Sequence, residues 1–224
     1  MTYDKVIISS GHSINCQGAS DLINEVTEAI RVTNRISEII KSAKKQCYVY
    51  HDTASKSNTN LSNIVKFHNN YKDGIDVSIH FNACNKTDNA VGVEVLYYTD
   101  GNKELASNLS KAISNASGLK NRGAKQRTNL GFLKNTNKGA VLIEVCFVDS
   151  KKDVELYKDN FEKICIAIAE TLSNKKYTSN NNSTDKVKYF RVIAGSYTNR
   201  DYAEAMKEQL TKYGIPSFLE VFEK

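Results

Sequence analysis

Short apolar runs alternate with longer amphipathic segments over the first 172 residues, and this alternation restricts the fold more than any other feature of the chain. The short runs are rich in β-branched and aromatic residues and predict strands at 6–8, 47–50, 75–82, 91–98 and 140–147. Apolar residues at helical spacing predict helices over 20–42, 61–69, 102–116 and 152–172. Strands and helices that alternate in this way form a largely parallel sheet with helices on both faces. The sequence therefore predicts an α/β fold with a mostly parallel sheet.

A change in composition at residues 173–187 predicts a linker. Residues 173–186 contain one aromatic residue, no aliphatic residue and a run of Asn and Ser, which is typical of flexible connections. The linker separates a predicted domain over residues 1–172 from a C-terminal segment over residues 188–224. Two apolar runs flank a helical pattern in that segment, so we expect a small βαβ unit there.

The net charge of +6 is moderate and is shared by both parts of the chain. No basic cluster is interleaved with aromatic residues, so the sequence predicts no nucleic-acid partner, whereas an anionic cell wall fits the charge. No apolar run approaches the about 20 residues that span a bilayer, so we expect no membrane insertion. The apolar run after Lys5 is too short for a signal peptide, and we expect synthesis in the cytoplasm without one.

Five cysteines are scattered along the chain without CxxC or CxxH spacing. An odd number without a paired pattern predicts free thiols. Cys47, Cys146 and Cys165 lie in apolar runs and are expected to behave as small core residues. The sequence thus argues against a zinc site built from cysteine.

Three polar residues follow or interrupt predicted strands. His12 follows the first strand after a glycine that allows a sharp turn. His80 lies near the end of the strand over residues 75–82, and Glu144 interrupts the apolar run at 140–147. The carboxyl ends of parallel strands meet at one edge of the sheet, where ligands bind. Structural roles for the histidines, and an ion pair that neutralises Glu144, are the alternatives.

The helix expected over residues 20–42 begins with two carboxylates. Glu25 lies three residues after Leu22, beside the stripe that is expected to be buried, and Glu28 is its rival. Either carboxylate could simply complement the positive end of the helix dipole. Two imidazoles and one carboxylate form a hydrolytic zinc site when a fourth position stays open for water, and a further carboxylate then accepts a proton. The spacing of these residues in the sequence does not by itself establish such a site.

Four motifs, in order along the chain, coincide with these elements. They are Gly11-His12 after the first strand, Glu25 at the start of the long helix, Ser78-Ile79-His80-Phe81-Asn82-Ala83, and Ala140-Val141-Leu142-Ile143-Glu144-Val145-Cys146-Phe147. Together with Asn121-Arg122-Gly123-Ala124 they resemble the Amidase_3 family of zinc N-acetylmuramoyl-L-alanine amidases, from Lys5 to about Leu172. The chain departs from the family pattern where Ser9-Ser10 and Ser13-Ile14 replace the usual Asp-Pro and Gly pair.

The resemblance implies a role for each motif. The residues expected to bind one Zn²⁺ ion are His12, Glu25 and His80, and the expected catalytic carboxylate is Glu144. The implied reaction cuts the amide bond between N-acetylmuramic acid and L-alanine, so bacterial peptidoglycan is the expected partner. We further expect substrate contacts from Asn82, on the His80 face of its strand, and from Arg122, in a loop suited to anchoring a carboxylate.

The compact catalytic region resembles clostridial phage endolysins more than the long-looped bacterial division amidases. An endolysin would reach the wall after a holin opens the membrane. The alternative is a sporulation autolysin that meets the wall when the mother cell lyses. Two further alternatives are a zinc endopeptidase or carboxypeptidase that cuts within the stem peptide, and a wall-binding protein without catalytic activity.

The C-terminal segment resembles one half of a SPOR-type peptidoglycan-binding repeat. The match rests on Val192-Ile193-Ala194-Gly195-Ser196-Tyr197 and on Asn199-Arg200-Asp201-Tyr202-Ala203-Glu204-Ala205. A single βαβ half of about 36 residues has too little core to be stable alone. We therefore predict that two chains pair these segments edge to edge in a homodimer, with docking onto the catalytic domain as the alternative.

Overall fold

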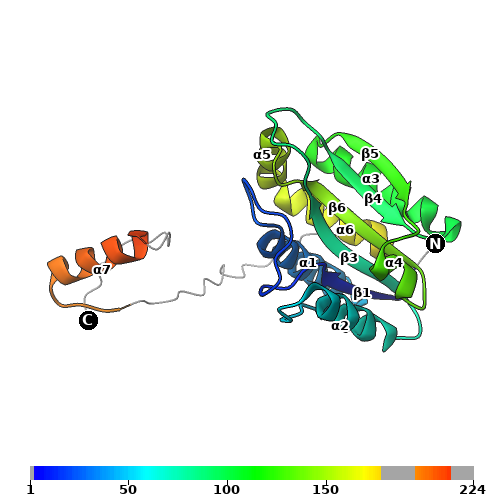
Figure 1. Ribbon diagram of the computed structural model, residues 1–224, viewed down its shortest axis with the longest axis horizontal. Helices are drawn as coiled ribbons and strands as arrows, with labels where there is room; N and C mark the ends of the chain where they lie inside the picture. The colour runs from blue at the N-terminus through cyan, green and yellow to red at the C-terminus, as the bar shows by residue number, and fades with distance from the viewer. Residues whose placement is uncertain (1–2, 178–194, 213–224) are drawn as a thin grey trace. The chain divides into compact units, whose positions relative to one another are not determined.

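A computed structural model describes residues 3–177 and 195–212 of the chain (Figure 1). The chain divides into two compact units, Met1–Thr178 and Ser179–Lys224. Most of the predicted linker over residues 173–187 falls outside the described residues, so the predicted domain boundaries stay a prediction.

The first unit is built on one sheet of six strands. These are β1 (Lys5–Ser10), β2 (Gln46–Tyr50), β3 (Ile75–Asn82), β4 (Val93–Tyr97), β5 (Asn121–Gln126) and β6 (Ala140–Phe147). Their order is β2-β1-β3-β6-β4-β5; the first four in this order are parallel, whereas β4 runs antiparallel to β6 and parallel to β5. The predicted α/β fold with a mostly parallel sheet is confirmed.

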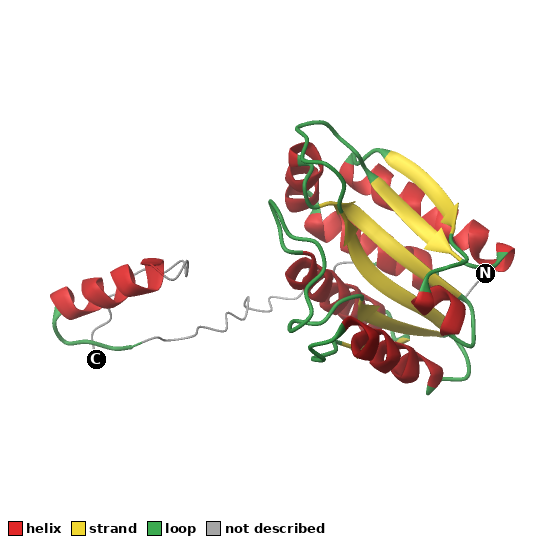
Figure 2. Cartoon of the chain, in the orientation of Figure 1, coloured by secondary structure: helices red, strands yellow, loops and turns green. Residues whose placement is uncertain are grey.

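Helices cover both faces of this sheet (Figure 2). They are α1 (Glu25–Ser42), α2 (Ser57–Asn69), α3 (Lys103–Ser117), α4 (Gly131–Asn135), α5 (Lys151–Asp159) and α6 (Phe161–Ser173), with a short 3₁₀ helix at Asp100–Asn102. α1, α3 and α6 lie on one face, and α2 and α4 lie on the other (Figures 1 and 2). The larger core, which contains Val77 and Ile143, lies beneath α1, α3 and α6. A smaller core, which contains Leu96, Phe132 and Leu142, lies beneath α2 and α4.

The first long helix begins later than the periodicity predicts. The side chain of Asn24 caps α1 by accepting a hydrogen bond from the Thr27 amide (3.0 Å), so the helix begins at Glu25. Leu22 therefore lies before the helix and is 39% exposed, which corrects its predicted place in the buried stripe.

The last helix, predicted over residues 152–172, is in fact two helices, α5 and α6. Asn160 separates them, with a φ of −122° that departs from helical geometry. Its side-chain amide donates to the carbonyl oxygens of Leu156 (3.0 Å) and Ser117 (3.3 Å). Such side-chain hydrogen bonds compete with the helical backbone pattern, which explains the break.

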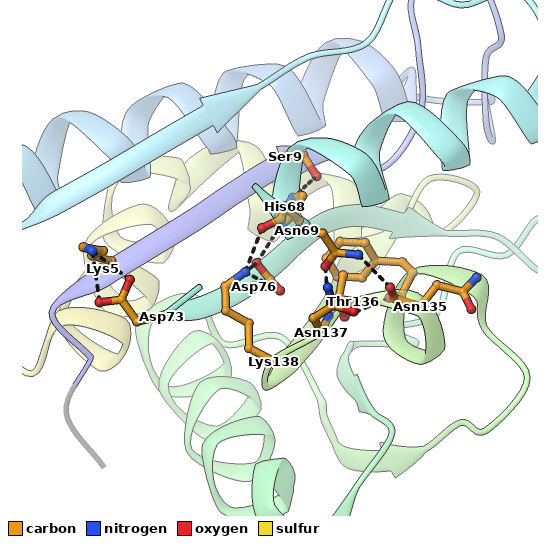
Figure 3. Close-up of polar contacts among 11 residues, drawn as sticks. Lys5, Ser9, His68, Asn69, Asp73, Asp76, Asn135, Thr136, Asn137 and Lys138 are labelled. Carbon is orange, nitrogen blue, oxygen red and sulfur yellow. Dashed lines mark hydrogen bonds and ion pairs between the residues drawn. The ribbon is translucent and has the colours of Figure 1, made fainter. Parts of the chain in front are cut away.

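A buried polar cluster ties α2 to the sheet (Figure 3). His68 of α2 lies 2.8 Å from Asp76 through Nδ1 and 3.0 Å from the Ser9 hydroxyl through Nε2. Lys138 Nζ donates to the second oxygen of Asp76 (2.9 Å), so the buried carboxylate has a cation beside it. Burial lowers the pKa of His68 and outweighs the opposite effect of Asp76. His68 is thus a structural residue that connects α2 with β1 and β3.

All five cysteines are free thiols, as the sequence predicts. Cys47, Cys146 and Cys165 are buried, and burial raises the pKa of each thiol. They contribute to the larger core as small apolar residues.

In the second unit, the structure describes α7 (Arg200–Lys212) and the residues that lead into it. This helix coincides with the helical pattern predicted for the C-terminal segment. The two apolar runs predicted as strands on either side of this helix lie mostly outside the described residues. None of the helices in residues 3–177 and 195–212 is long and apolar enough to cross a membrane.

Candidate active site

Three side chains converge beyond the carboxyl ends of β1 and β3. His12 follows β1, Glu25 is the first residue of α1, and His80 lies near the end of β3. Each of the three residues offers one potential ligand atom, and these three atoms all lie within 4.8 Å of one another. Glu25 Oε1 is 3.6 Å from His12 Nε2 and 3.0 Å from His80 Nδ1. The structure thus brings together the three residues that the sequence predicts as metal ligands.

Two glycines let the backbone approach these side chains closely. A Cβ atom at Gly11 would lie 1.8 Å from His80 Nε2, so the imidazole ring occupies the space that any other residue would fill. A Cβ atom at Gly18 would lie 2.1 Å from Glu25 Oε2. The same carboxylate oxygen accepts a hydrogen bond from the Ala19 amide (2.7 Å), which fixes its orientation.

The two separations measured from Glu25 are compatible with a tetrahedral zinc ion. Nitrogen and oxygen ligands lie about 2.0–2.2 Å from zinc, which places tetrahedral ligands about 3.4 Å from one another. The observed separations of 3.0 and 3.6 Å lie on either side of that value. Two imidazoles and one carboxylate also match catalytic zinc sites that keep a fourth position for water. His12, Glu25 and His80 are therefore suited to hold one Zn²⁺ ion.

The charges of the three side chains compensate one another. Burial opposes protonation of His80, but its hydrogen bond with Glu25 and the charges of Glu144 and Glu25 outweigh burial and raise its pKa. Burial raises the pKa of Glu25, yet His80 and His12 lower it overall. Burial and the charge of His80 lower the pKa of His12. The raised pKa of His80 and the lowered pKa of Glu25 favour a protonated imidazole beside an ionised carboxylate. A metal ion held by these residues would take the place of that proton.

Glu144 lies beside His80 on the neighbouring strand β6, where the two residues are paired across the sheet. Its Oε2 atom is buried and has no hydrogen-bond partner among the described residues. Burial raises the pKa of Glu144 to about 7; His80 opposes this effect, whereas Glu25 and Glu94 add to it. A carboxylate with such a pKa can accept and release a proton near neutral pH, as general acid–base chemistry requires.

The rival carboxylate Glu28 belongs to a different set of contacts. It accepts hydrogen bonds from the Tyr157 hydroxyl (2.6 Å) and from Arg31 (2.6 Å), and thereby joins α1 to α5. Glu25, rather than Glu28, is the carboxylate that lies with the two imidazoles.

Asn82 and Arg122, the two predicted substrate-contact residues, both contact Glu94, a carboxylate that is not among the residues predicted from the sequence. Glu94 of β4 is paired with Glu144 across the sheet, and it accepts hydrogen bonds from Asn82 Nδ2 (3.2 Å) and Arg122 Nε (2.7 Å). Arg122 lies on β5, which corrects its predicted place in a loop. The pattern Val93-Glu94-Val95, a carboxylate between valines in a predicted strand, is the signal that could have identified Glu94.

A metal-ligand cluster beside a carboxylate of raised pKa, at the carboxyl edge of a mostly parallel sheet, is typical of metal-dependent hydrolases. The chain belongs to the Amidase_3 family, described as N-acetylmuramoyl-L-alanine amidase, which matches residues 6–174. The matched region contains every residue of the candidate site.

Relatives support this membership. The chain is 34% identical over 161 residues to an uncharacterized 38.4 kDa protein of Clostridium perfringens. The matched residues make up 69% of this chain and 46% of that protein. It is 26% identical over 176 residues to the probable cell wall amidase LytH of Staphylococcus epidermidis. This match covers 78% of this chain and 58% of LytH. The chain spans about half the length of the curated relatives it matches.

Two solved structures show the same fold. One is the catalytic domain of the CD27L endolysin targeting Clostridia difficile, with 27% identity, a TM-score of 0.71, and coverage of 78% of this chain and 99% of that one. The other is the catalytic domain of CwlV, an N-acetylmuramoyl-L-alanine amidase from Bacillus (Paenibacillus) polymyxa, with 25% identity, a TM-score of 0.67, and coverage of 78% and 97%.

Proposed function

We propose that this chain hydrolyses the amide bond between N-acetylmuramic acid and L-alanine in bacterial peptidoglycan, with one Zn²⁺ ion held by His12, Glu25 and His80. The observation that carries the proposal is the convergence of these three side chains beside Glu144 in a member of an amidase family. A zinc ion in this site supplies a Lewis acid for the scissile carbonyl and lowers the pKa of water from about 15.7 towards about 7.

Glu144 is proposed to move the proton. As a carboxylate it accepts a proton from the attacking water, and as an acid it passes that proton to the departing amine of L-alanine. A pKa of about 7 in the metal-free site supports both roles, and a nearby cation shifts the balance towards the carboxylate. Asn82 is proposed to line the substrate site from the same face of β3.

The proposed cellular role is that of a phage or prophage endolysin, made in the cytoplasm and admitted to the wall by a holin. The similarity to the CD27L catalytic domain supports this role. A sporulation autolysin would use the same chemistry and differ in when it meets the wall. Expression in a Gram-positive host tests the role: lysis that requires a co-expressed holin supports an endolysin, and lysis confined to sporulating cultures supports an autolysin.

The C-terminal unit is proposed to bind the wall as a SPOR-like half repeat and to pair two chains. Ala203, Met206 and Leu210 of α7 lie at helical spacing and are half-buried, whereas Tyr202 is 67% exposed. An apolar stripe of this kind is suited to a second copy of the segment. Sedimentation equilibrium of the full chain and of residues 1–178 tests the pairing; a monomeric full chain would contradict it.

Product analysis tests the proposed reaction. Wild type and Glu144→Gln are incubated with purified Gram-positive peptidoglycan, with a chelator and after zinc is restored, and mass spectrometry identifies the new ends. Zinc-dependent release of peptides that begin with a free L-alanine amine, by wild type alone, supports the amidase. Metal-dependent cuts elsewhere in the stem would assign an endopeptidase or carboxypeptidase. Wall binding without cleavage would leave a binding protein.

A further inference from the structure

Four polar residues form a row across the sheet, one on each of four neighbouring strands. In order from β3 to β5 they are His80, Glu144, Glu94 and Arg122. Neighbouring strands lie about 4.8 Å apart, so the row extends about 14 Å from the proposed metal site towards the edge of the sheet. The last two members have no part in the proton transfer proposed above.

A bulge in β5 directs Arg122 into this row. Arg122 and Gly123 together face the single residue Glu94 of β4, because the register shifts at this point. Gly123 adopts a φ of +79°, a conformation that favours glycine. Bulges next to active sites commonly re-aim a side chain. Here the bulge brings the guanidinium of an edge strand against a buried carboxylate.

The guanidinium of Arg122 is held on two sides. Its Nε donates to Glu94 (2.7 Å), and its Cζ atom lies 5.1 Å from the centre of the Phe147 ring. Glu94 is only 5% exposed, and its second oxygen accepts from Asn82 (3.2 Å). The side chain of Arg122 remains 35% exposed, and its two terminal nitrogens have no partner among the described residues. The two terminal nitrogens are therefore free to donate to a ligand.

A guanidinium fixed in this way matches a carboxylate, which accepts two parallel hydrogen bonds from it. Because Glu94 offsets the charge of Arg122, this recognition depends on directed donors more than on net positive charge. An extended peptide advances about 3.3–3.6 Å per residue, so a stem peptide that follows the row from an L-alanine amine at Glu144 places its second residue near Glu94. That residue is a glutamate linked through its γ-carboxyl group, and its α-carboxyl group is either free or amidated.

Building on the proposed amidase function, we propose that Arg122 binds the free α-carboxylate of the second stem-peptide residue and that Glu94 is the positioning residue for Arg122. The site then prefers isoglutamate to isoglutamine. A carboxylate accepts from both terminal nitrogens of Arg122, whereas a carboxamide has one acceptor oxygen and turns an NH₂ group towards the other donor.

Two synthetic muropeptides that differ only in this group test the proposal. The zinc-loaded full chain is expected to show a KM about 10- to 100-fold lower for the isoglutamate substrate, with similar kcat values. Arg122→Gln removes this preference. Glu94→Gln reduces it although Arg122 keeps its charge, and Arg122→Lys restores only part of it. Lys125→Gln, which removes an exposed cation from the same strand, leaves the preference unchanged.

Equal KM values for the two substrates in wild type would overturn the proposal, as would equal losses on both substrates in Arg122→Gln. Cleavage of neither substrate by wild type would instead overturn the proposed amidase function. In that case calorimetric binding of L-alanyl-isoglutamate and L-alanyl-isoglutamine to the same variants still decides whether Arg122 reads the carboxylate. Thermal unfolding of each variant verifies that it is folded.

Discussion

Along β6, successive side chains point to opposite faces of the sheet, and the two faces differ in the polarity of their residues. Ile143 belongs to the larger core beneath α1, α3 and α6, which is apolar along the length of the strand. Leu142 belongs to the smaller core beneath α2 and α4, and Glu144 follows it on the same face. Beyond that smaller core the face carries the polar row from His80 to Arg122. One strand thus contributes core residues on one face and both core and candidate-site residues on the other.

The largest expected effect is on the chemical face. Glu144→Gln removes the group that accepts and returns the proton but keeps its size, so kcat should fall by about 10²- to 10⁴-fold. Zinc content, measured by elemental analysis, should stay at one ion per chain. A variant that retains more than a tenth of the wild-type kcat would exclude Glu144 as the proton carrier.

The second prediction compares two carboxylates of α1. Glu25→Gln replaces a proposed ligand and should weaken zinc binding by at least about 100-fold, more than the loss of a group that only orients a ligand. Glu28→Gln is the matched control, because it alters the contacts with Tyr157 and Arg31 and should leave zinc affinity unchanged. Competition with a fluorescent chelator gives both affinities. A larger loss in Glu28→Gln would reverse the ligand assignment.

A pair of core substitutions compares how much each face of β6 contributes to the free energy of unfolding. Ile143→Ala, in the larger core, should cost stability near the upper end of the about 2–5 kcal/mol typical of buried aliphatic residues, and Leu142→Ala near the lower end. The difference follows from the smaller core around Leu142, which can relax more easily. Urea unfolding of the metal-free variants measures both costs. Equal costs would mean that the two faces stabilise the fold to the same extent.

The smallest expected effect is a dependence of stability on pH in the metal-free protein. The pKa of Glu144 is raised from 4.5 to about 7 on folding, so its ionisation destabilises the fold as pH rises through that range. Glu144→Gln cannot ionise, and its melting temperature relative to wild type should increase by roughly 5–10 °C between pH 5 and pH 8. The ionisation costs wild type about 2 kcal/mol over this range, and about 1 kcal/mol corresponds to 2–4 °C. A difference that does not change with pH would contradict the raised pKa.

The sequence predicts the strands better than the site. β3 and β6 have the bounds that their apolar runs predict, since both are central strands with turn residues on either side. β5 escapes prediction because Ala124 is its only aliphatic residue, and this omission places Arg122 in a loop. The break at Asn160 escapes prediction because the side chain that causes it bonds partly to α3, far away in the sequence.

The candidate site required more than periodicity. A carboxylate within a buried strand identifies Glu144 directly, because such a group needs a partner. The same pattern around Glu94 is interrupted by Gly92 on its N-terminal side, so the apolar run before the carboxylate is less continuous. No spacing rule joins His12, Glu25 and His80, since three different elements bring them together, and only the family resemblance predicts them as a set.

Diffraction from crystals of the zinc-loaded protein, recorded on both sides of the zinc absorption edge, would locate the metal ion directly. We expect one anomalous peak bound by His12 Nε2, Glu25 and His80 Nδ1, with Glu144 nearby and not a ligand. A peak bound by Glu144 or Glu94, or zinc bound away from the three residues, would contradict it.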